Sequence, residues 1–566
     1  MPFASTGDSG YSRRVAFGWE ETSRWVLAAG AGALLGLAFP DPGWSGLAWV
    51  APGAMLLAAA GHSGIRAFRL GFIGGLTYHL VALGWLLTIP FPWGAVAGWC
   101  ALSGYLALFQ GAWVWLCWRM APAGSHGTSA TDRGEHSWLE SIDLLLAGSG
   151  MRRGLWMIWC AALWVALEMV QARLFTGFPW GLLGMSQFRL VPVIQLASFT
   201  GVYGISFLVV WTALSLGLAM LRVLRQPSVH WGWMTELRLP LLAVVIVGCL
   251  GMWRLGNRVH EPRTLRMALV QPSIPQELLW NEQEDQRRFD QLRQLSELAL
   301  ATRPQVLVWP ESAFPAFTEE NFRAVTNLVG QHGVWMVFGA DDAEPRNAAD
   351  GAEGYDSFNA AFLLNPQGRL AGVYRKQRLV VFGEYVPLAR WLPFLRHFTP
   401  IQGSFKTGDG PVDFELRDPD CVVSVLICFE DVFPHLARRH AGAGVDLLLN
   451  LTNNGWFPRS SAQWQHAANA VFRAVENGLP LVRATNDGLT CWVDARGRLR
   501  QWLGQDTGDI HSAGFMTVAI PLPPAEGGRV ATFYNRYGDV FGWGCVVLAV
   551  AGLAASIRRR RSGDAR

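Results

Sequence analysis

Three side chains of the kinds used in acyl transfer each follow an apolar, strand-like run. Glu311 ends the run Q-V-L-V-W-P-E, Lys376 ends A-G-V-Y-R-K, and Cys428 ends V-S-V-L-I-C. A thiol with an ordinary pKa of about 8.5 needs a base or a positive neighbour before it reacts as a thiolate at neutral pH. A carboxylate can take that proton and return it later, and an ammonium group can stabilise the oxyanion of a tetrahedral intermediate. Together these residue types predict covalent catalysis by a cysteine.

Each of the three also has an ordinary structural interpretation. A lone cysteine at the end of a strand is usually a packing residue, and a strand-terminal Glu or Lys is usually solvated. A disulfide between Cys421 and Cys428 is not expected, because an extended strand would hold them about 23 Å apart. A disulfide needs Cα atoms within about 7 Å of each other. The thiol of Cys428 is therefore either a buried packing group or a reactive group that takes part in chemistry.

The elements around these residues favour the functional interpretation. Between 264 and 520, short and continuously apolar strand patterns alternate with helical ones. This pattern is typical of an α/β sheet that is buried on both faces. In such sheets ligands bind at the carboxyl ends of the strands, where all three residues lie.

The remainder of the chain predicts a polytopic membrane domain. The sequence is 51% hydrophobic and only 16% charged, against about 25% charged residues in an average soluble protein. A transmembrane helix needs about 20 apolar residues, and eight such spans are expected, the first two forming a helical hairpin. They lie at 25–40, 44–60, 69–88, 93–117, 154–171, 201–221, 239–255 and 538–557.

Arginine placement predicts the orientation of these spans by the positive-inside rule. Basic clusters precede the first span, separate alternate spans and end the chain, whereas the loops at 41–44 and 89–92 carry no Lys or Arg. Both termini are then cytoplasmic, and the large insert is periplasmic. No cleavable signal peptide is expected. The predicted domains are 1–256 (seven spans), 257–530 (catalytic) and 531–566 (the eighth span and a basic tail).

Composition also excludes some functions. The formal net charge is only +4, and no basic face with interleaved aromatic residues indicates nucleic-acid binding. The 28 tryptophans fit a membrane protein with interfacial aromatic belts. No metal or cofactor is expected, and the chain is expected to act as a monomer.

The triad resembles the Glu–Lys–Cys centre of the nitrilase superfamily. Over nearly the whole chain, the sequence is more specifically similar to the apolipoprotein N-acyltransferase family, the membrane branch of that superfamily. The motifs that carry this resemblance are F-T-G-F-P-W (175–180), V-Q-P-S-I-P-Q-E-L-L-W (270–280), V-W-P-E-S-A-F-P (308–315), V-F-G-E-Y-V-P (381–387), C-F-E (428–430), N-N-G-W-F (453–457), R-A-V-E-N-G (473–478), A-T-N-D-G (484–488) and F-Y-N-R-Y-G-D (533–539).

This resemblance implies a nitrilase-like αββα sandwich and a role for each motif residue. Cys428 would be the nucleophile, Glu311 the general base and Lys376 the cation that stabilises the oxyanion. The resemblance further implies that Glu384 and Glu430 are additional essential acids. It also implies that Phe429 occupies a position that is aromatic in the family and that Trp280 lines the substrate pocket.

The implied reaction is a two-step acyl exchange in the bacterial inner membrane. Cys428 would attack the sn-1 ester of a phospholipid such as phosphatidylethanolamine and form a thioester. The α-amino group of a diacylglyceryl-cysteine at the N-terminus of an apolipoprotein would then take the acyl chain, which is the last step of lipoprotein maturation.

The residues themselves leave several roles open. Glu430 is either a solvated loop acid or a group that holds Lys376 in place. Glu384 lies in an apolar stretch, where an unpaired charge is costly, so an ion pair with Lys376 is expected. The chain departs from the family pattern at Arg378, Val381 and Asn454, which affects loop packing only.

Other features also have two interpretations. The insert 389–398 is rich in Trp, Leu and Phe, and is either a lipid-facing lid or plain core packing. Structural roles are favoured for His466, Arg473 and Glu476 on the helix expected at 460–477. Glu168, inside a predicted span, is either functional or a structural hydrogen-bond partner.

Three rival functions remain. A membrane-tethered amidase would share the triad but would need only one helix. A transporter should carry charged residues midway along several spans, and apart from Glu168 the predicted spans carry almost none. A catalytically inactive lipoprotein-binding protein would have no need of all three triad residues.

Overall fold

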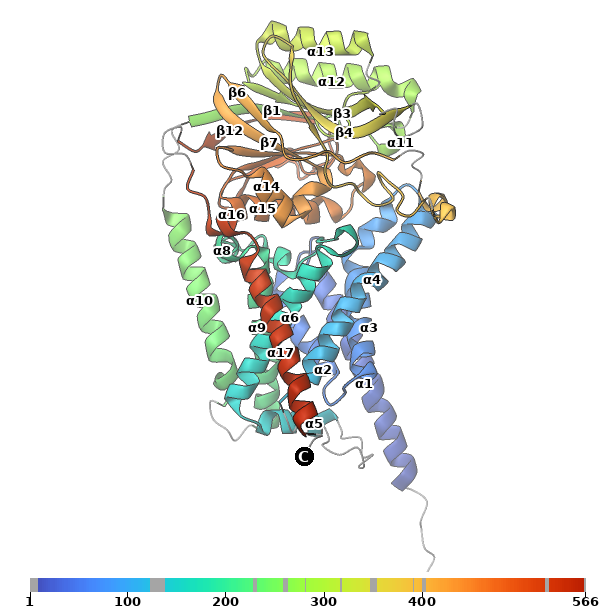
Figure 1. Ribbon diagram of the computed structural model, residues 1–566, viewed down its shortest axis with the longest axis vertical. Coiled ribbons are helices and arrows are strands. Elements are labelled where there is room, and N and C mark those ends of the chain that lie inside the picture. The colour runs from blue at the N-terminus through green and yellow to red at the C-terminus, as the bar shows by residue number, and fades with distance from the viewer. Residues whose placement is uncertain are drawn as a thin grey trace, which may run out of the picture.

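The computed structural model describes residues 9–563, except 123–137, 227–231, 258–262, 280, 316–317, 347–353, 390, 400–403 and 525–528. The molecule is elongated, with long helices at one end and an α/β domain at the other (Figure 1). The first described helix begins, and the last one ends, at the end of the molecule that is remote from the α/β domain.

Nine helices of the helical region set its shape. They are α1 (Ser9–Leu37), α2 (Ala51–Ala58), α3 (Ile65–Ala82), α4 (Pro92–Arg119), α5 (Trp138–Ala147), α6 (Gly150–Gln171), α9 (Val202–Arg225), α10 (Met234–Gly256) and α17 (Val540–Gly563). In the described part of the chain, five helices are long and apolar enough to cross a membrane, namely α4, α6, α9, α10 and α17.

The first three of the eight predicted spans fall on α1, α2 and α3, which are not among those five. The predicted hairpin is present, since α2 and the 3-10 turn before it (η1, Ser45–Trp49) fold back against α1. The number of eight spans therefore stays a prediction.

Short helices fill the chain between α6 and α9. They are η3 (Leu174–Thr176), η4 (Leu183–Gln187), α7 (Val191–Ile194) and α8 (Ala197–Thr200). This segment lies between the long helices and the α/β domain (Figure 1), and the motif F-T-G-F-P-W (175–180) forms its first part.

The α/β domain contains two six-stranded mixed sheets. The first has the strand order β12-β1-β2-β3-β4-β5 and the second the order β11-β10-β9-β8-β7-β6. Their bounds are β1 Arg263–Gln271, β2 Val306–Val308, β3 Trp335–Pro345, β4 Tyr355–Leu364, β5 Leu370–Arg375, β6 Asp413–Arg417, β7 Asp420–Ile427, β8 Leu447–Thr452, β9 Leu481–Thr485, β10 Cys491–Val493, β11 Leu499–Trp502 and β12 Gly514–Leu522.

The two sheets pack face to face between two helical layers. Leu269 of β1 and Val425 of β7 belong to one buried core between the sheets. Helices α12 (Asp285–Leu300) and α13 (Glu319–His332) cover the other face of the first sheet. On the second sheet lie α14 (Pro434–His440), which contacts β7, and α15 (Ala462–Asn477), which contacts β9. The predicted sandwich of two sheets between helices is therefore present.

Helix α15 joins the two parts of the molecule. Phe472 of α15 shares a buried core with Leu448 of β8 and with Val209 of α9 in the helical region. The helix ends at Asn477 and is capped by Gly478, whose φ of 65° lies in the left-handed region, a conformation that glycine adopts without steric cost. The α/β domain thus rests on the helices through a continuous apolar core.

Parallel strands bring the predicted residues to one edge. β1, β2 and β3 run parallel in the first sheet, and β7, β8 and β9 run parallel in the second. Glu311 follows the carboxyl end of β2, and Cys428 follows that of β7. Because the sheets face each other, these two ends can share one site.

Candidate active site

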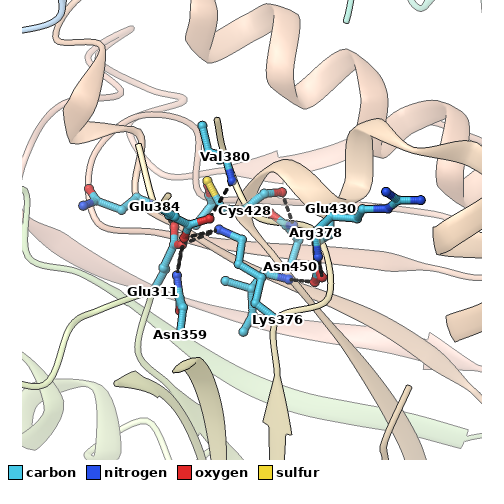
Figure 2. Close-up of polar contacts among 12 residues, drawn as sticks. Glu311, Asn359, Lys376, Arg378, Val380, Glu384, Cys428, Glu430 and Asn450 are labelled. Carbon is cyan, nitrogen blue, oxygen red and sulfur yellow. Dashed lines mark hydrogen bonds and ion pairs between the residues drawn. The ribbon is translucent and has the colours of Figure 1, made fainter. Parts of the chain in front are cut away.

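Glu311, Lys376 and Cys428 lie together (Figure 2). Lys376 Nζ is 3.1 Å from Glu311 Oε1. The sulfur of Cys428 is directed toward the end of Lys376 and the carboxylates of Glu311 and Glu384 (Figure 2), and it interacts electrostatically with all three. The fold therefore brings together Glu311, Lys376 and Cys428, as predicted from the three strand ends.

Lys376 is an almost fully buried ammonium group held by two carboxylates. Its side chain is 1% exposed, and its Nζ also lies 2.8 Å from Glu384 Oε1. This is the predicted ion pair. Burial on its own would lower the pKa of Lys376, but the charges of Glu311 and Glu384 outweigh burial and raise that pKa well above its ordinary value. Lys376 therefore stays a cation at neutral pH.

Asn359 of β4 holds the carboxylates of Glu311 and Glu384 in position. Its Nδ2 donates to Glu311 Oε1 and to Glu384 Oε1, at 2.8 Å each. The second oxygen of Glu311 accepts from the main-chain N–H of Asn453 at 2.8 Å. Sequence reasoning missed Asn359, although a polar residue in the apolar run F-N-A-A-F-L-L is a signal that a buried partner exists.

The Cys428 backbone is held in an unusual conformation. Its φ is 52°, in the left-handed region, and it opens the 3-10 helix η8 (Cys428–Val432) directly after β7. Its carbonyl oxygen accepts from Asn450 Nδ2 at 3.0 Å and lies 3.3 Å from His466 Nε2. His466 Nε2 is also 2.9 Å from Asp431 Oδ1. The other ring nitrogen, Nδ1, lies 2.9 Å from Asn454 Oδ1, so both nitrogens of His466 are engaged within the site.

The thiol of Cys428 is protonated at neutral pH. Burial and the nearby Glu311 carboxylate raise its pKa to about 12, against the opposing effect of Lys376. A resting thiolate is therefore not available at neutral pH.

Glu430 does not contact the Lys376 ammonium. Its Oε1 accepts from the main-chain N–H groups of Gln377 at 2.7 Å and Arg378 at 3.1 Å, and its Oε2 accepts from Ile427 N at 2.8 Å. It is fully buried, which rules out a solvated loop acid. Glu430 therefore ties the segment after Lys376 to the segment before Cys428 through main-chain bonds, and it interacts with the lysine through charge.

Phe429 turns away from the triad toward the helical region. Its ring centroid lies 5.9 Å from that of Phe178, 6.2 Å from that of Trp180 and 5.1 Å from that of Phe433. The motif at 175–180 thus packs directly on the residue after Cys428. Trp280, the predicted pocket residue, lies outside the described residues.

Two of the three α15 residues have the structural role that was favoured. Arg473 Nε lies 2.8 Å from Glu476 Oε2, both side chains are fully buried, and Glu476 Oε1 accepts from Val202 N of α9 at 2.9 Å. His466 is different, because it contacts the main chain of Cys428. It belongs to the site, which spacing along the helix alone could not reveal.

The insert after residue 388 is exposed rather than packed in the core. Its 3-10 helix η7 (Pro393–Phe398) contacts α4 and lies beside the upper end of that helix (Figure 1). Trp391 is 78% exposed and Phe394 is 56% exposed. Core packing is therefore excluded for these two side chains.

Glu168 makes hydrogen bonds of the structural kind within the helical region. It is buried, and its Oε1 accepts from Trp164 Nε1 at 3.0 Å and from Leu183 N at 2.8 Å. These bonds hold the start of η4.

Within the described residues, no group of three or more His, Cys, Asp or Glu side chains is arranged to hold a metal ion.

Comparisons with known proteins cover both parts of the chain. Residues 31–215 match the family described as "Apolipoprotein N-acyltransferase N-terminal domain", and residues 266–522 match "Carbon-nitrogen hydrolase".

Curated relatives match along almost the full length. An apolipoprotein N-acyltransferase of Geobacter metallireducens is 36% identical over 95% of this chain and 96% of its own length. One from Brucella melitensis biotype 1 is 30% identical over 84% of each chain. Among solved structures, an amidase from Nesterenkonia sp. is 18% identical with a TM-score of 0.34, over 47% of this chain and 93% of its own.

Proposed function

The chain belongs to the apolipoprotein N-acyltransferase family, and from that premise we propose that it moves an acyl chain from a phospholipid to the N-terminus of an apolipoprotein through a thioester on Cys428. The observation that carries this proposal is the grouping of the Cys428 thiol with Glu311 and with a lysine that two carboxylates keep charged.

In the first half-reaction, Cys428 attacks the sn-1 ester of a phospholipid such as phosphatidylethanolamine. Glu311 takes the Sγ proton while the new C–S bond forms, and the ammonium of Lys376 faces the negative oxygen of the tetrahedral intermediate. The C–O bond to glycerol then breaks, and Glu311 returns the proton to the glycerol oxygen. Lysophospholipid leaves and the acyl chain stays on Cys428 as a thioester.

In the second half-reaction, the α-amino group of a diacylglyceryl-cysteine attacks the thioester carbonyl. Glu311 takes one proton from the amine as the amide C–N bond forms, the C–S bond breaks, and Glu311 returns the proton to the leaving sulfur to give back the thiol. The sequence is ping-pong, because the phospholipid product leaves before the acceptor reacts. Covalent catalysis of this kind splits one difficult step into two easier ones.

Four further residues would support these steps. Glu384 keeps Lys376 charged and in place, and Glu430 fixes the two main-chain segments that carry Lys376 and Cys428. Phe429 packs the nucleophile loop on the helices. Trp280 is proposed to line the substrate pocket from its position in the family motif.

The location of the site suits two lipid-anchored substrates. We place the helices in the bacterial inner membrane with both termini in the cytoplasm and residues 257–530 in the periplasm, between the domains 1–256 and 531–566. The exposed apolar side chains of the insert, Trp391 and Phe394, would then face lipid beside the upper end of α4. Eight spans and a monomer are part of this proposal.

The deciding experiment uses the purified full-length protein and phospholipid alone. We expect one acyl mass on the peptide that contains Cys428, released by neutral hydroxylamine, and no adduct in Cys428→Ala. Glu311→Gln should bind phospholipid normally but form the thioester about 100-fold more slowly, as expected for loss of a general base. Unchanged transferase activity in Cys428→Ala would exclude the mechanism.

A further inference from the structure

Gln465 of α15 is a buried junction between the α/β domain and the helical region. Its Oε1 accepts from Trp180 Nε1 at 2.9 Å and from Trp85 Nε1 at 3.2 Å. Its Nε2 donates to the carbonyl of Pro40 at 2.7 Å and to that of Ala82 at 3.0 Å. Both donors and both acceptor positions of the amide are therefore used.

These four partners belong to the helical region and come from different segments, and Nε2 also lies 3.4 Å from Ser461 Oγ just before α15. Pro40 follows α1, Ala82 ends α3, Trp85 lies in the 3-10 helix η2 (Gly84–Thr88), and Trp180 follows α6. Gln465, Trp85 and Trp180 are 6%, 5% and 4% exposed. A buried amide in these surroundings is costly to leave unpaired, so the four bonds fix one position of α15 over the helices.

The same junction reaches the nucleophile by two short routes. The ring of Trp180 stacks on Phe429 at 6.2 Å and lies 5.3 Å from His466, measured between centroids. His466 is the next residue after Gln465, and its Nε2 contacts the Cys428 carbonyl. A shift of α15 over the helices would therefore move the main chain of Cys428 and Phe429.

We propose that Gln465 and Trp180 are positioning residues that set the nucleophile loop at the depth where a donor lipid, held among the helices, presents its ester. This inference rests on the proposed thioester mechanism. The reaction of Cys428 with a small soluble ester needs only the triad. The ester of a membrane-held lipid has a fixed depth, so the Cys428 sulfur must also lie at that depth to reach the ester carbonyl. A misplacement of about 1 Å can cost about 100-fold in rate.

The test compares two acyl donors in the full-length protein, with acylation of Cys428 as the readout. The donors are phosphatidylethanolamine in mixed micelles and p-nitrophenyl butyrate in water. In Gln465→Met, which keeps the side-chain volume but removes the hydrogen bonds, we expect the phospholipid rate to fall by about tenfold or more and the butyrate rate to change by less than about threefold.

Trp180→Phe provides an independent variant, because it keeps an aromatic ring on Phe429 and removes only the indole N–H. We expect the same selective loss, and a loss in the double variant smaller than the product of the two single losses, since both act on one junction. This variant keeps the proposal testable if Gln465→Met does not fold.

Gln463→Met is the matched control. Gln463 is on the same helix and is also buried, but its Nε2 donates to Asn454 O at 3.2 Å and Phe457 O at 3.1 Å, both within the α/β domain. Its removal should affect both donors by a similar factor. Equal losses for both donors in Gln465→Met and Trp180→Phe, or no loss in either, would overturn the positioning role. Absence of any thioester in the unaltered protein would instead overturn the proposed function.

Discussion

At the scale of single residues, Cys428 lies where ionisation is unfavourable. Burial and the Glu311 carboxylate raise the pKa of its thiol to about 12. The alkylation of Cys428 by iodoacetamide, which requires the thiolate, should therefore keep rising well above pH 9. This rate can be followed by mass spectrometry of the Cys428 peptide, and a plateau near pH 8.5 would contradict the account.

Glu311→Gln should separate the two effects of that carboxylate. Loss of its negative charge lowers the pKa of Cys428, so alkylation at pH 8 should become faster by about threefold or more. Acylation by phospholipid should become slower in the same variant, because the base is gone. A decrease in both rates would mean that Glu311 does not act on the thiol as a charge.

Glu430 should make stability depend on pH. Burial raises the pKa of its carboxyl group to about 7, although hydrogen bonds from Ile427 and Gln377 oppose the shift. An unfolded chain has a Glu pKa of about 4.3, so the folded protein holds this proton more tightly. The resulting stabilisation is complete below about pH 4.3 and is lost as pH rises to about 7.

The measurement is the melting temperature of the unaltered protein and of Glu430→Gln in detergent, between pH 4.5 and 8.5. The difference between the two should change in favour of the variant as pH rises toward 7 and then stay constant. A difference that does not depend on pH would show that Glu430 is ionised throughout.

At the scale of elements, α15 carries a buried ion pair as well as the junction at Gln465. Arg473 and Glu476 are both fully buried, and Glu476 also accepts from α9. Arg473→Met leaves the carboxylate unpaired and should destabilise the protein by about 3–5 kcal/mol. The double variant with Glu476→Gln should recover part of this loss, as seen in melting temperatures. A single variant as stable as the parent protein would contradict this role.

The exposed insert gives a second prediction at this scale. A photo-crosslinking amino acid in place of Trp391 should form adducts with phospholipid in nanodiscs, because the insert lies beside the upper end of α4. The same probe at Asn327 of α13 is the control, since α13 is on the side of the α/β domain away from the helices (Figure 1). Protein-only adducts at Trp391 would mean that the insert does not face lipid.

At the scale of the whole molecule, α1 begins and α17 ends at the end remote from the α/β domain (Figure 1). This arrangement fits the prediction that both termini lie on one side of the membrane and the α/β domain on the other. Asn327→Cys, on α13, should react with an impermeant maleimide in spheroplasts. Met151→Cys, 76% exposed at the start of α6, should react only after lysis, and the reverse pattern would invert the proposed topology.

The sequence by itself determined that the chain combines apolar helices with an α/β domain, and it predicted the three residues that the fold groups together. Runs such as V-S-V-L-I-C are local signals, because a strand that is buried on both faces must be continuously apolar. The polar residue that follows such a run is then placed at the sheet edge. Pairing of Glu384 with Lys376 was also predictable, since an unpaired charge in an apolar stretch is costly.

Only the tertiary structure decided which polar groups meet across the fold. Asn359 bridges two carboxylates from other segments, Glu430 bonds main-chain N–H groups rather than the lysine, and Gln465 bonds a carbonyl 425 residues earlier in the chain. No local pattern encodes such partners, because a buried polar side chain is satisfied by whatever groups packing brings within about 3 Å. The residue types that carry the chemistry are thus local properties of the sequence, and the contacts that hold them in register are properties of the folded chain.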